Sequence, residues 1–131
     1  MLAVRSLFRW VPAVAMMGII FLASSTPASH LPYFGAIDLL VKKGGHAIGY
    51  ALLGLSYFYA LPSRLSIPYR AVMALLMALL FSLSDEFHQS FVEGRTSSLR
   101  DVLIDAGGAS LALFTAAIYS SSSKSSSNSG S

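Results

Sequence analysis

YRAVMALLMALLFSLSDEFHQSFVEGR, residues Tyr69 to Arg95, runs from an uninterrupted apolar segment into a stretch of acids, a histidine, a glutamine and an arginine. The apolar part and the polar stretch together predict one helix that crosses a bilayer and ends in a polar cap. From Tyr69 to Ser84 such a helix rises about 24 Å, slightly less than the roughly 30 Å hydrocarbon core of a bilayer. Asp85 and Glu86 therefore fall near a membrane interface, because charges at the bilayer centre cost about 2.5–3.5 kcal/mol each.

The composition of the whole chain agrees with a membrane environment. The chain has 131 residues, of which 54% are hydrophobic and 11% charged, whereas soluble domains carry about 25% charged residues. The lack of cysteine excludes a disulfide scaffold and any cysteine-based metal site. A net charge of +3 without a basic, aromatic-rich stripe sets nucleic acid aside as a partner.

Four apolar segments divide the chain. They are residues 10–25, 43–61, 69–83 and 102–119. The first also fits a secretory signal, because arginines precede it and small residues follow, but three further segments come after it and we expect it to be retained. No segment alternates with period 2, as a membrane β-barrel requires, and helices satisfy their own backbone hydrogen bonds in lipid.

The expected fold is therefore an all-α integral membrane bundle of four transmembrane helices. Residues 1–119 form its single domain, and the serine-rich residues 120–131 are expected to be a disordered tail. Two rows of small residues predict close helix packing: Gly45 with Gly49, and Gly108 with Ala112 and Ala116.

Four spans bring two polar segments to the same side of the membrane. The residues before the second span and those between the third and fourth share that side, which carries all six Asp and Glu. The expected polar pocket consists of Lys43, His46, Tyr50, Asp85, Glu86, His88, Gln89, Arg95, Arg100, Asp101 and Asp105. Of the nine Lys and Arg, five lie on the opposite side with the termini, which favours a cytoplasmic N-terminus and an extracytoplasmic pocket.

Three motifs carry a resemblance to a known family. KKGGHAIGYALLGL (42–55), SDEFHQSFVEGRTSSLRDVLIDAGGA (84–109) and, more weakly, FLASSTP (21–27) resemble the VanZ-like membrane proteins. The resemblance implies a small bacterial multi-span protein of the cytoplasmic membrane, in a family whose namesake lowers susceptibility to the glycopeptide antibiotic teicoplanin. The chain departs from the family pattern at Lys42, Glu93 and Asp105, where relatives often carry Asp, Pro and Asn.

Four interpretations of the polar residues remain open. The first is structural: Asp85 or Glu86 pairs with Lys43 or Arg95, and Arg100 pairs with Asp101 or Asp105, so that the charges only fix loops and helix ends. In the second, Lys43, Tyr50, His88, Gln89, Arg95, Arg100, Asp101 and Asp105 bind a lipid headgroup, with the basic residues contacting a phosphate. The third adds catalysis by Glu86, Asp85 and His46 as acid–base groups. The fourth is a divalent metal on Asp85, Glu86 and a histidine, but no HExxH-like spacing is present and we expect neither metal nor cofactor.

The expected function is recognition, with or without modification, of a cell-envelope lipid or glycolipid headgroup at this interfacial pocket. The sequence does not decide whether the protein is an enzyme. The alternative is a non-catalytic envelope protein that binds or shields a lipid-linked target, as in antibiotic tolerance. The oligomeric state is open.

Overall fold

The computed structural model describes residues 2–95 and 97–130, and within those ranges the chain is helical with no strand. Its helices are α1 (Leu2–Phe8), α2 (Val11–Ser25), α3 (Asp38–Ala60), α4 (Ile67–Gln89) and α5 (Leu99–Ser129), with the short 3₁₀ turns η1 (Ala28–His30) and η2 (Gly35–Ile37). The all-α prediction is confirmed.

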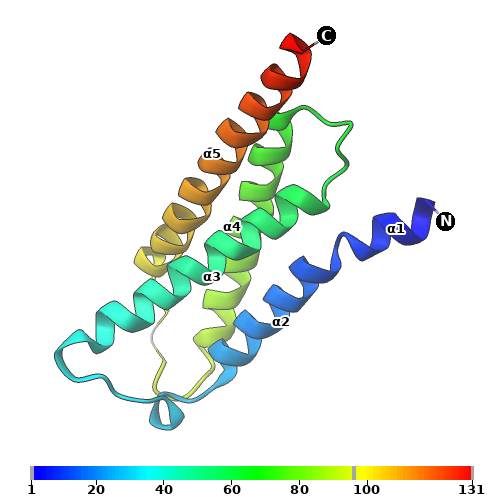
Figure 1. The fold of residues 1–131 in the computed structure, drawn as a ribbon. Helices are drawn as coiled ribbons and strands as arrows, with labels where there is room; N and C mark the ends of the chain where they lie inside the picture. The colour runs from blue at the N-terminus through cyan, green and yellow to red at the C-terminus, as the bar shows by residue number, and fades with distance from the viewer. Residues whose placement is uncertain (1, 96, 131) are drawn as a thin grey trace.

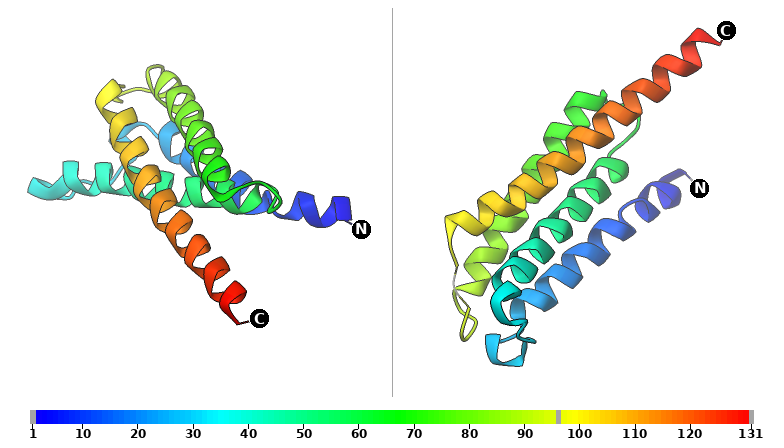
Figure 2. Two further views of the ribbon diagram at one scale, coloured as in Figure 1. Left: turned by 90° about the horizontal axis from the view of Figure 1, so that it is seen from above. Right: turned by 60° about the vertical axis from the view of Figure 1, so that its left-hand side comes forward.

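The four long helices pack side by side, and the links between them fall at two ends (Figures 1 and 2). The α2–α3 and α4–α5 links lie together at one end of the bundle, and the α3–α4 loop lies at the other end with the N-terminus. The polar segments before α3 and after α4 therefore lie at the same end of the bundle.

Local signals in the sequence explain where the helices begin. The Ser66 hydroxyl accepts a hydrogen bond from the Tyr69 backbone N–H at the start of α4, and Ser98 accepts one from Asp101 at the start of α5. Serine is a favoured N-cap because its oxygen satisfies a free backbone donor of the first turn. Pro12 and Pro68 lie in the first turns of α2 and α4, where a missing N–H costs nothing.

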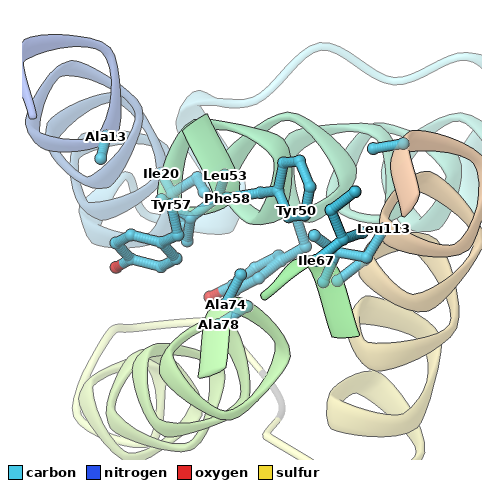
Figure 3. Close-up of a cluster of buried hydrophobic side chains, with 12 residues drawn as sticks. Ala13, Ile20, Tyr50, Leu53, Tyr57, Phe58, Ile67, Ala74, Ala78 and Leu113 are labelled. Atoms are coloured by element: carbon cyan, nitrogen blue, oxygen red, sulfur yellow. The ribbon is translucent and has the colours of Figure 1, made fainter. Parts of the chain in front are cut away.

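Helix α3 occupies the centre of the bundle and contacts α2, α4 and α5. Its buried face contributes Tyr50, Leu53, Tyr57 and Phe58 to a core shared with small residues of the neighbouring helices (Figure 3). Those neighbours are Ala13 and Ile20 of α2, Ala74 and Ala78 of α4, and Ala109, Leu113 and Ala116 of α5. Large side chains on the central helix thus pack against five alanines, Ile20 and Leu113 around it.

Three helical segments are long and apolar enough to cross a membrane: Ala3–Ser25, Ile67–Gln89 and Leu99–Ser129. Four spans were expected, and the described residues contain three helices that meet these criteria. Helix α3 is as long as α4, but its glycines, its tyrosines and His46 lower its apolar content. Surrounded on three sides by protein, α3 has less need of hydrocarbon-compatible side chains than the outer helices, whose exposed residues include Leu80, Leu103 and Phe114.

The serine-rich tail begins as a continuation of α5. Residues 120–129 extend that helix and are exposed from Ser121 on, Ser131 lies outside the described residues, and disorder of the tail stays a prediction. The tail directly follows an established helix, so it extends the helix without a nucleation step, and each added residue gains a backbone hydrogen bond.

The two rows of small residues behave differently. A Cβ atom on Gly108 would overlap the Ala47 carbonyl oxygen and lie 2.9 Å from the Ala47 carbonyl carbon, so α5 and α3 are in backbone contact there. The expected close approach at Gly45 is absent, since a Cβ atom there would meet nothing within 4 Å. At Gly49 the same atom would lie 3.7 Å from Ile20 of α2, an ordinary contact.

Candidate functional site

A polar cavity of about 170 Å³ lies at the end of the bundle where the α2–α3 and α4–α5 links meet. Its lining comes from three helices and both links: Leu31, Leu39, Lys42, Lys43, His46, Glu86, Gln89, Gly94, Arg95, Asp101, Ile104 and Asp105. Two segments that are distant in sequence therefore form one site, as the threading of the spans predicts.

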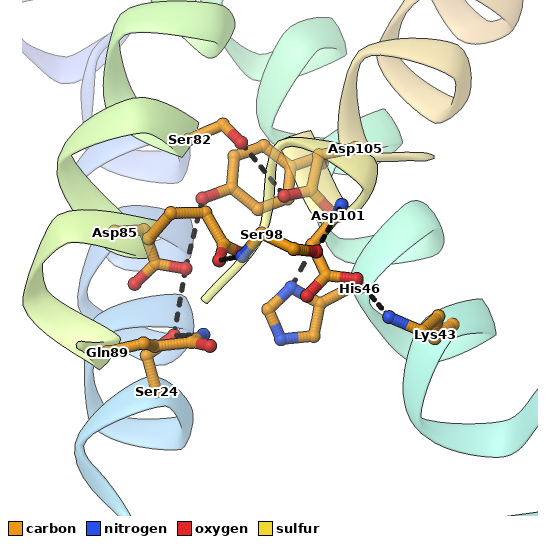
Figure 4. A network of polar contacts seen from close by, with 11 residues as sticks. Ser24, Lys43, His46, Ser82, Asp85, Gln89, Ser98, Asp101 and Asp105 are labelled. Atoms are coloured by element: carbon orange, nitrogen blue, oxygen red, sulfur yellow. Dashed lines mark hydrogen bonds and ion pairs between the residues drawn. The ribbon is translucent and has the colours of Figure 1, made fainter. Parts of the chain in front are cut away.

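Asp85 joins three helices behind this cavity (Figure 4). Its Oδ2 atom accepts a hydrogen bond of 2.9 Å from the Ser24 hydroxyl of α2 and one of 3.2 Å from the Tyr50 hydroxyl of α3. The Gln89 side-chain amide donates to the same Ser24 hydroxyl at 3.0 Å. Asp85 does not line the cavity, so its contacts fix the relative positions of α2, α3 and α4.

Asp105 of α5 lies against both α4 and α3. Its Oδ2 accepts a hydrogen bond of 2.9 Å from Ser82, and the Nδ1 atom of His46 lies 3.5 Å from its Oδ1. The carboxylate is 1% exposed, whereas His46 is partly exposed to the cavity. A buried carboxylate behind one ring nitrogen is the arrangement that orients an imidazole for proton transfer or ligand contact at the other nitrogen.

Glu86 carries the least satisfied carboxylate of the cavity wall. Its Oε2 accepts one hydrogen bond, of 3.2 Å, from the Ser98 backbone N–H, while its Oε1 is buried without a partner among the described residues. The Oδ1 atom of Asp105 likewise has no hydrogen bond, His46 being too distant. An unsatisfied buried polar group costs about 1–3 kcal/mol, so these two oxygens favour a ligand that donates hydrogen bonds.

The lysines of the cavity are paired with acids of the links and helix starts. Lys43 forms an ion pair with Asp101 at the start of α5, and Lys42 forms one of 2.8 Å with Asp38 at the start of α3. The hydrogen bond from Lys42 lowers the pKa of the Asp38 carboxyl below its ordinary value, because it stabilises the charged form. Each pair is neutral overall, and Glu86 has no cationic partner among the described ion pairs.

Arg95 holds the α4–α5 link against the end of α2. Its Nε donates to the Thr26 carbonyl oxygen at 3.0 Å and its Nη2 to the Ala23 carbonyl oxygen at 2.6 Å. The last carbonyls of a helix lack intrahelical partners and attract cations. Gly94, whose φ of 74° favours glycine, turns the link so that Arg95 points toward α2.

The structure brings together seven of the eleven residues expected in the pocket and places four outside it. The seven in the cavity wall are Lys43, His46, Glu86, Gln89, Arg95, Asp101 and Asp105. Tyr50 and Asp85 lie behind the wall, joined to each other by a hydrogen bond. His88 packs against Phe21 with ring centroids 4.6 Å apart and contacts Ser25 at 2.9 Å, while Arg100 is exposed outside the wall.

The charge pairs that the structural interpretation predicts are absent among the described residues. The predicted pairing of Arg100 with Asp101 or Asp105 is not formed. Asp101 pairs with Lys43 instead, and Asp105 pairs with His46. Neither Asp85 nor Glu86 pairs with a lysine or arginine among the described ion pairs. Their partners are hydroxyl and backbone groups, which leave the carboxylates available to further donors.

Sequence reasoning missed the serines that hold the acids. The hydroxyls of Ser24 and Ser82 donate to the carboxylates of Asp85 and Asp105, and the backbone N–H of Ser98 donates to Glu86. The sequence signal was present for two of them: Ser24 and Ser82 are polar residues in otherwise apolar segments, and Ser82 lies one turn before Asp85. A serine in a span is a natural partner for an acid on a neighbouring helix.

The metal interpretation has no donor set in this structure. Among residues 2–95 and 97–130, no three His, Asp or Glu side chains gather closely enough to hold a metal ion. Asp85 and Glu86 face different partners, Ser24 on one side and Ser98 on the other, and so do not converge on one point.

Comparison with known proteins assigns the chain to a sequence family. The sequence model of the family described as VanZ/LLP1 matches residues 8–120, which include all the cavity-lining residues. No curated protein and no solved structure gives a significant match. Because the match covers most of the chain, this membrane-type helical bundle belongs to the VanZ-like family.

Proposed function

We propose that the protein binds the polar headgroup of a membrane lipid or glycolipid in the cavity between α3, α4 and α5. The observation that carries this proposal is Glu86, a residue of the cavity wall that is 6% exposed and whose Oε1 atom is buried without a hydrogen-bond partner in the described chain. A ligand with hydroxyl or amine groups satisfies such an acceptor, and Asp105 offers a second one nearby.

The charges of the cavity support a headgroup of mixed character. Lys42, Lys43 and Arg95 line it together with Glu86, Asp101 and Asp105, so basic and acidic side chains are equal in number. The lysines and Arg95 are suited to a phosphate or carboxylate, and the acids to hydroxyl or ammonium groups. A headgroup that carries both kinds of group matches this wall better than a simple anion.

The location supports a lipid as the source of that headgroup. The cavity lies at the polar ends of α4 and α5, two helices apolar enough to span a membrane. A site at this level meets lipid headgroups at very high local concentration. We place the protein in the bacterial cytoplasmic membrane with its N-terminus in the cytoplasm and the cavity on the outer side.

Lipid retention by the purified protein tests the proposal. Glu86→Gln removes the charge and keeps the shape, and a charge-assisted hydrogen bond contributes about 1.5–3 kcal/mol, so we expect bound donor-bearing lipid to fall about ten- to a hundredfold. The protein is exchanged into nanodiscs with equal phosphatidylethanolamine, phosphatidylglycerol and phosphatidylcholine, and the lipid that remains after delipidation is quantified by mass spectrometry.

Glu93→Gln is the matched control, because Glu93 is an exposed acid of the α4–α5 link outside the cavity. Phosphatidylcholine serves as a second control, since its quaternary ammonium has no N–H to donate. Equal retention of the three lipids by the wild type, or equal retention by the two variants, would refute headgroup recognition through Glu86.

The pair formed by His46 and Asp105 supports a second function, acid–base catalysis on the bound headgroup. His46 lies in the cavity wall with Asp105 behind it, and Glu86 is a further acid–base group of the same wall. Asp85 supports this arrangement from behind. If the protein is catalytic, His46→Ala abolishes product formation from an envelope lipid extract while bound lipid is retained. If the wild type yields no product, the result favours a non-catalytic protein that binds or shields its lipid target.

A further inference from the structure

An apolar groove opens between α2 and α3 and runs from the polar cavity toward the middle of the bundle. Its cavity measures about 320 Å³, and its lining is mainly apolar: Met16, Ile19, Ile20, Ala23, Leu31, Val41, Lys42, Gly45, His46, Gly49, Tyr50 and Arg95. From Ala23 back to Met16 the groove follows α2 for about 10 Å by helix rise, around two thirds of the depth of one hydrocarbon leaflet.

The groove and the polar cavity share part of their walls. Leu31, Lys42, His46 and Arg95 line both spaces. A molecule with a polar end between Glu86 and Lys43 could therefore continue along α2 without leaving the protein surface. The polar groups concentrate at one end of this path and the apolar groups at the other, which is the distribution within a lipid.

We propose that this groove holds one hydrocarbon chain of the lipid whose headgroup occupies the polar cavity. The proposal rests on the proposed function and adds the position of the tail. Gly45 and Gly49 form the α3 side of the groove, and their missing side chains provide the space that the chain fills. This gives the Gly45–Gly49 step a role other than helix contact, consistent with the open space found at Gly45.

The separation of α2 and α3 changes along the groove. At Gly49 a Cβ atom would be 3.7 Å from Ile20, so α2 and α3 come together at that level. One turn earlier, at Gly45, a Cβ atom would meet nothing within 4 Å. The groove is therefore more open at the level of Gly45 than at Gly49, and in the proposal one chain lies in it while the second chain of a diacyl lipid stays in the bilayer.

Filling the groove from Gly45 provides a specific test. Gly45→Leu adds a side chain into open space and replaces a helix-weakening residue, so the fold is preserved. Gly44→Leu is the matched control: it is the adjacent glycine, its Cβ would also meet nothing within 4 Å, and Gly44 lines neither the groove nor the cavity. Ala23→Leu narrows the same groove from α2 and repeats the test independently.

The probe is phosphatidylethanolamine with a photoreactive diazirine in the middle of one acyl chain, in vesicles of phosphatidylethanolamine and phosphatidylglycerol. After irradiation, cross-linked peptides are identified by mass spectrometry. We expect wild-type labelling to concentrate in residues 16–23 and 41–49, to fall at least fivefold in Gly45→Leu and Ala23→Leu, and to change less than twofold in Gly44→Leu. Labelling spread evenly over α4 and α5, or unchanged by Gly45→Leu, overturns the proposal.

The Glu86→Gln variant separates this inference from the proposed function. In one outcome, labelling is concentrated in the groove and Gly45→Leu removes it, but no headgroup preference depends on Glu86. This result refutes headgroup recognition and supports the hydrocarbon-chain site. In the opposite outcome, the headgroup preference depends on Glu86, but labelling is even and does not change in Gly45→Leu. This result supports headgroup recognition and refutes the hydrocarbon-chain site.

Discussion

Adding one methyl group at Gly108 should separate the two most extensively packed helices of the bundle. The new Cβ atom would overlap the Ala47 carbonyl oxygen, with the Ala47 carbonyl carbon at 2.9 Å and its Cα at 3.1 Å. These are backbone atoms of α3, so no side-chain rotation relieves the overlap, and α5 must move away from α3. Overpacking of a fitted interior costs about 1–3 kcal/mol, and we expect Gly108→Ala to reach the upper end because backbone atoms are involved.

Gly107→Ala is the control at the preceding position. Its Cβ atom would meet nothing within 4 Å, and alanine is favoured over glycine in a helix by about 0.5–1 kcal/mol. The two adjacent substitutions should therefore change stability in opposite directions, Gly108→Ala lowering it and Gly107→Ala leaving it unchanged or slightly raised.

Unfolding in mixed micelles measures the difference. The fraction of sodium dodecyl sulfate that unfolds half of the protein is determined for each variant, with Trp10 fluorescence and circular dichroism as probes. A gap of about 2–4 kcal/mol between the variants corresponds to a factor of at least 30 in the unfolding equilibrium constant. Equal midpoints for Gly107→Ala and Gly108→Ala would show that α3 and α5 are not in backbone contact and would refute the packing described here.

Three further changes test the site and the topology. Arg95→Gln should lower stability by about 1–3 kcal/mol, because it removes two charge-assisted hydrogen bonds to the end of α2, and thermal unfolding in detergent measures the loss. Ser24→Ala should cost about 1–3 kcal/mol in the same assay, since Asp85 loses a buried donor. Single cysteines at Ser63 and Ser97, both exposed in loops at opposite ends of the bundle, should react with an impermeant thiol reagent from opposite sides of the membrane.

The chain supplies matched controls for these tests. Arg100→Gln removes an exposed arginine outside the cavity, and Ser84→Ala removes an exposed serine of α4 that bonds only its own helix at Leu80. Losses in the control variants equal to those of Arg95→Gln and Ser24→Ala would assign the effects to general sensitivity. Reaction of both cysteines from one side would contradict the proposed crossing of the membrane.

Helix positions followed from composition and spacing because lipid permits few backbone solutions. The apolar segments at 10–25, 69–83 and 102–119 lie within helices that are long and apolar enough to span a membrane. The boundary of α3 was less predictable: the helix begins at Asp38, five residues before the apolar segment at Lys43, because Asp38 and Lys42 form a local ion pair in its first turn. That contact depends on side-chain geometry that hydrophobicity does not record.

The shared side of the polar segments also followed from the sequence, since it depends only on the order of the helices. The individual ion-pair and hydrogen-bond partners did not follow from the sequence. Lys43 pairs with Asp101 and not with Asp85 or Glu86, and Arg95 contacts backbone carbonyls of α2 instead of a carboxylate. Partner choice depends on the rotation of each helix about its axis, and that rotation is set by packing contacts such as Gly108 against Ala47.

The central position of α3 bears on how the bundle comes apart. The polar face of α3 presents Lys43, His46 and Tyr50 to groups on α4 and α5, and each of these contacts is lost if the helix that supplies its partner leaves. The polar side chains of α3 are unfavourable in hydrocarbon. If one outer helix dissociates, these side chains become exposed to lipid and the remaining helices lose stability. Unfolding should then be cooperative, with the four long helices separating in a single transition and no stable three-helix intermediate.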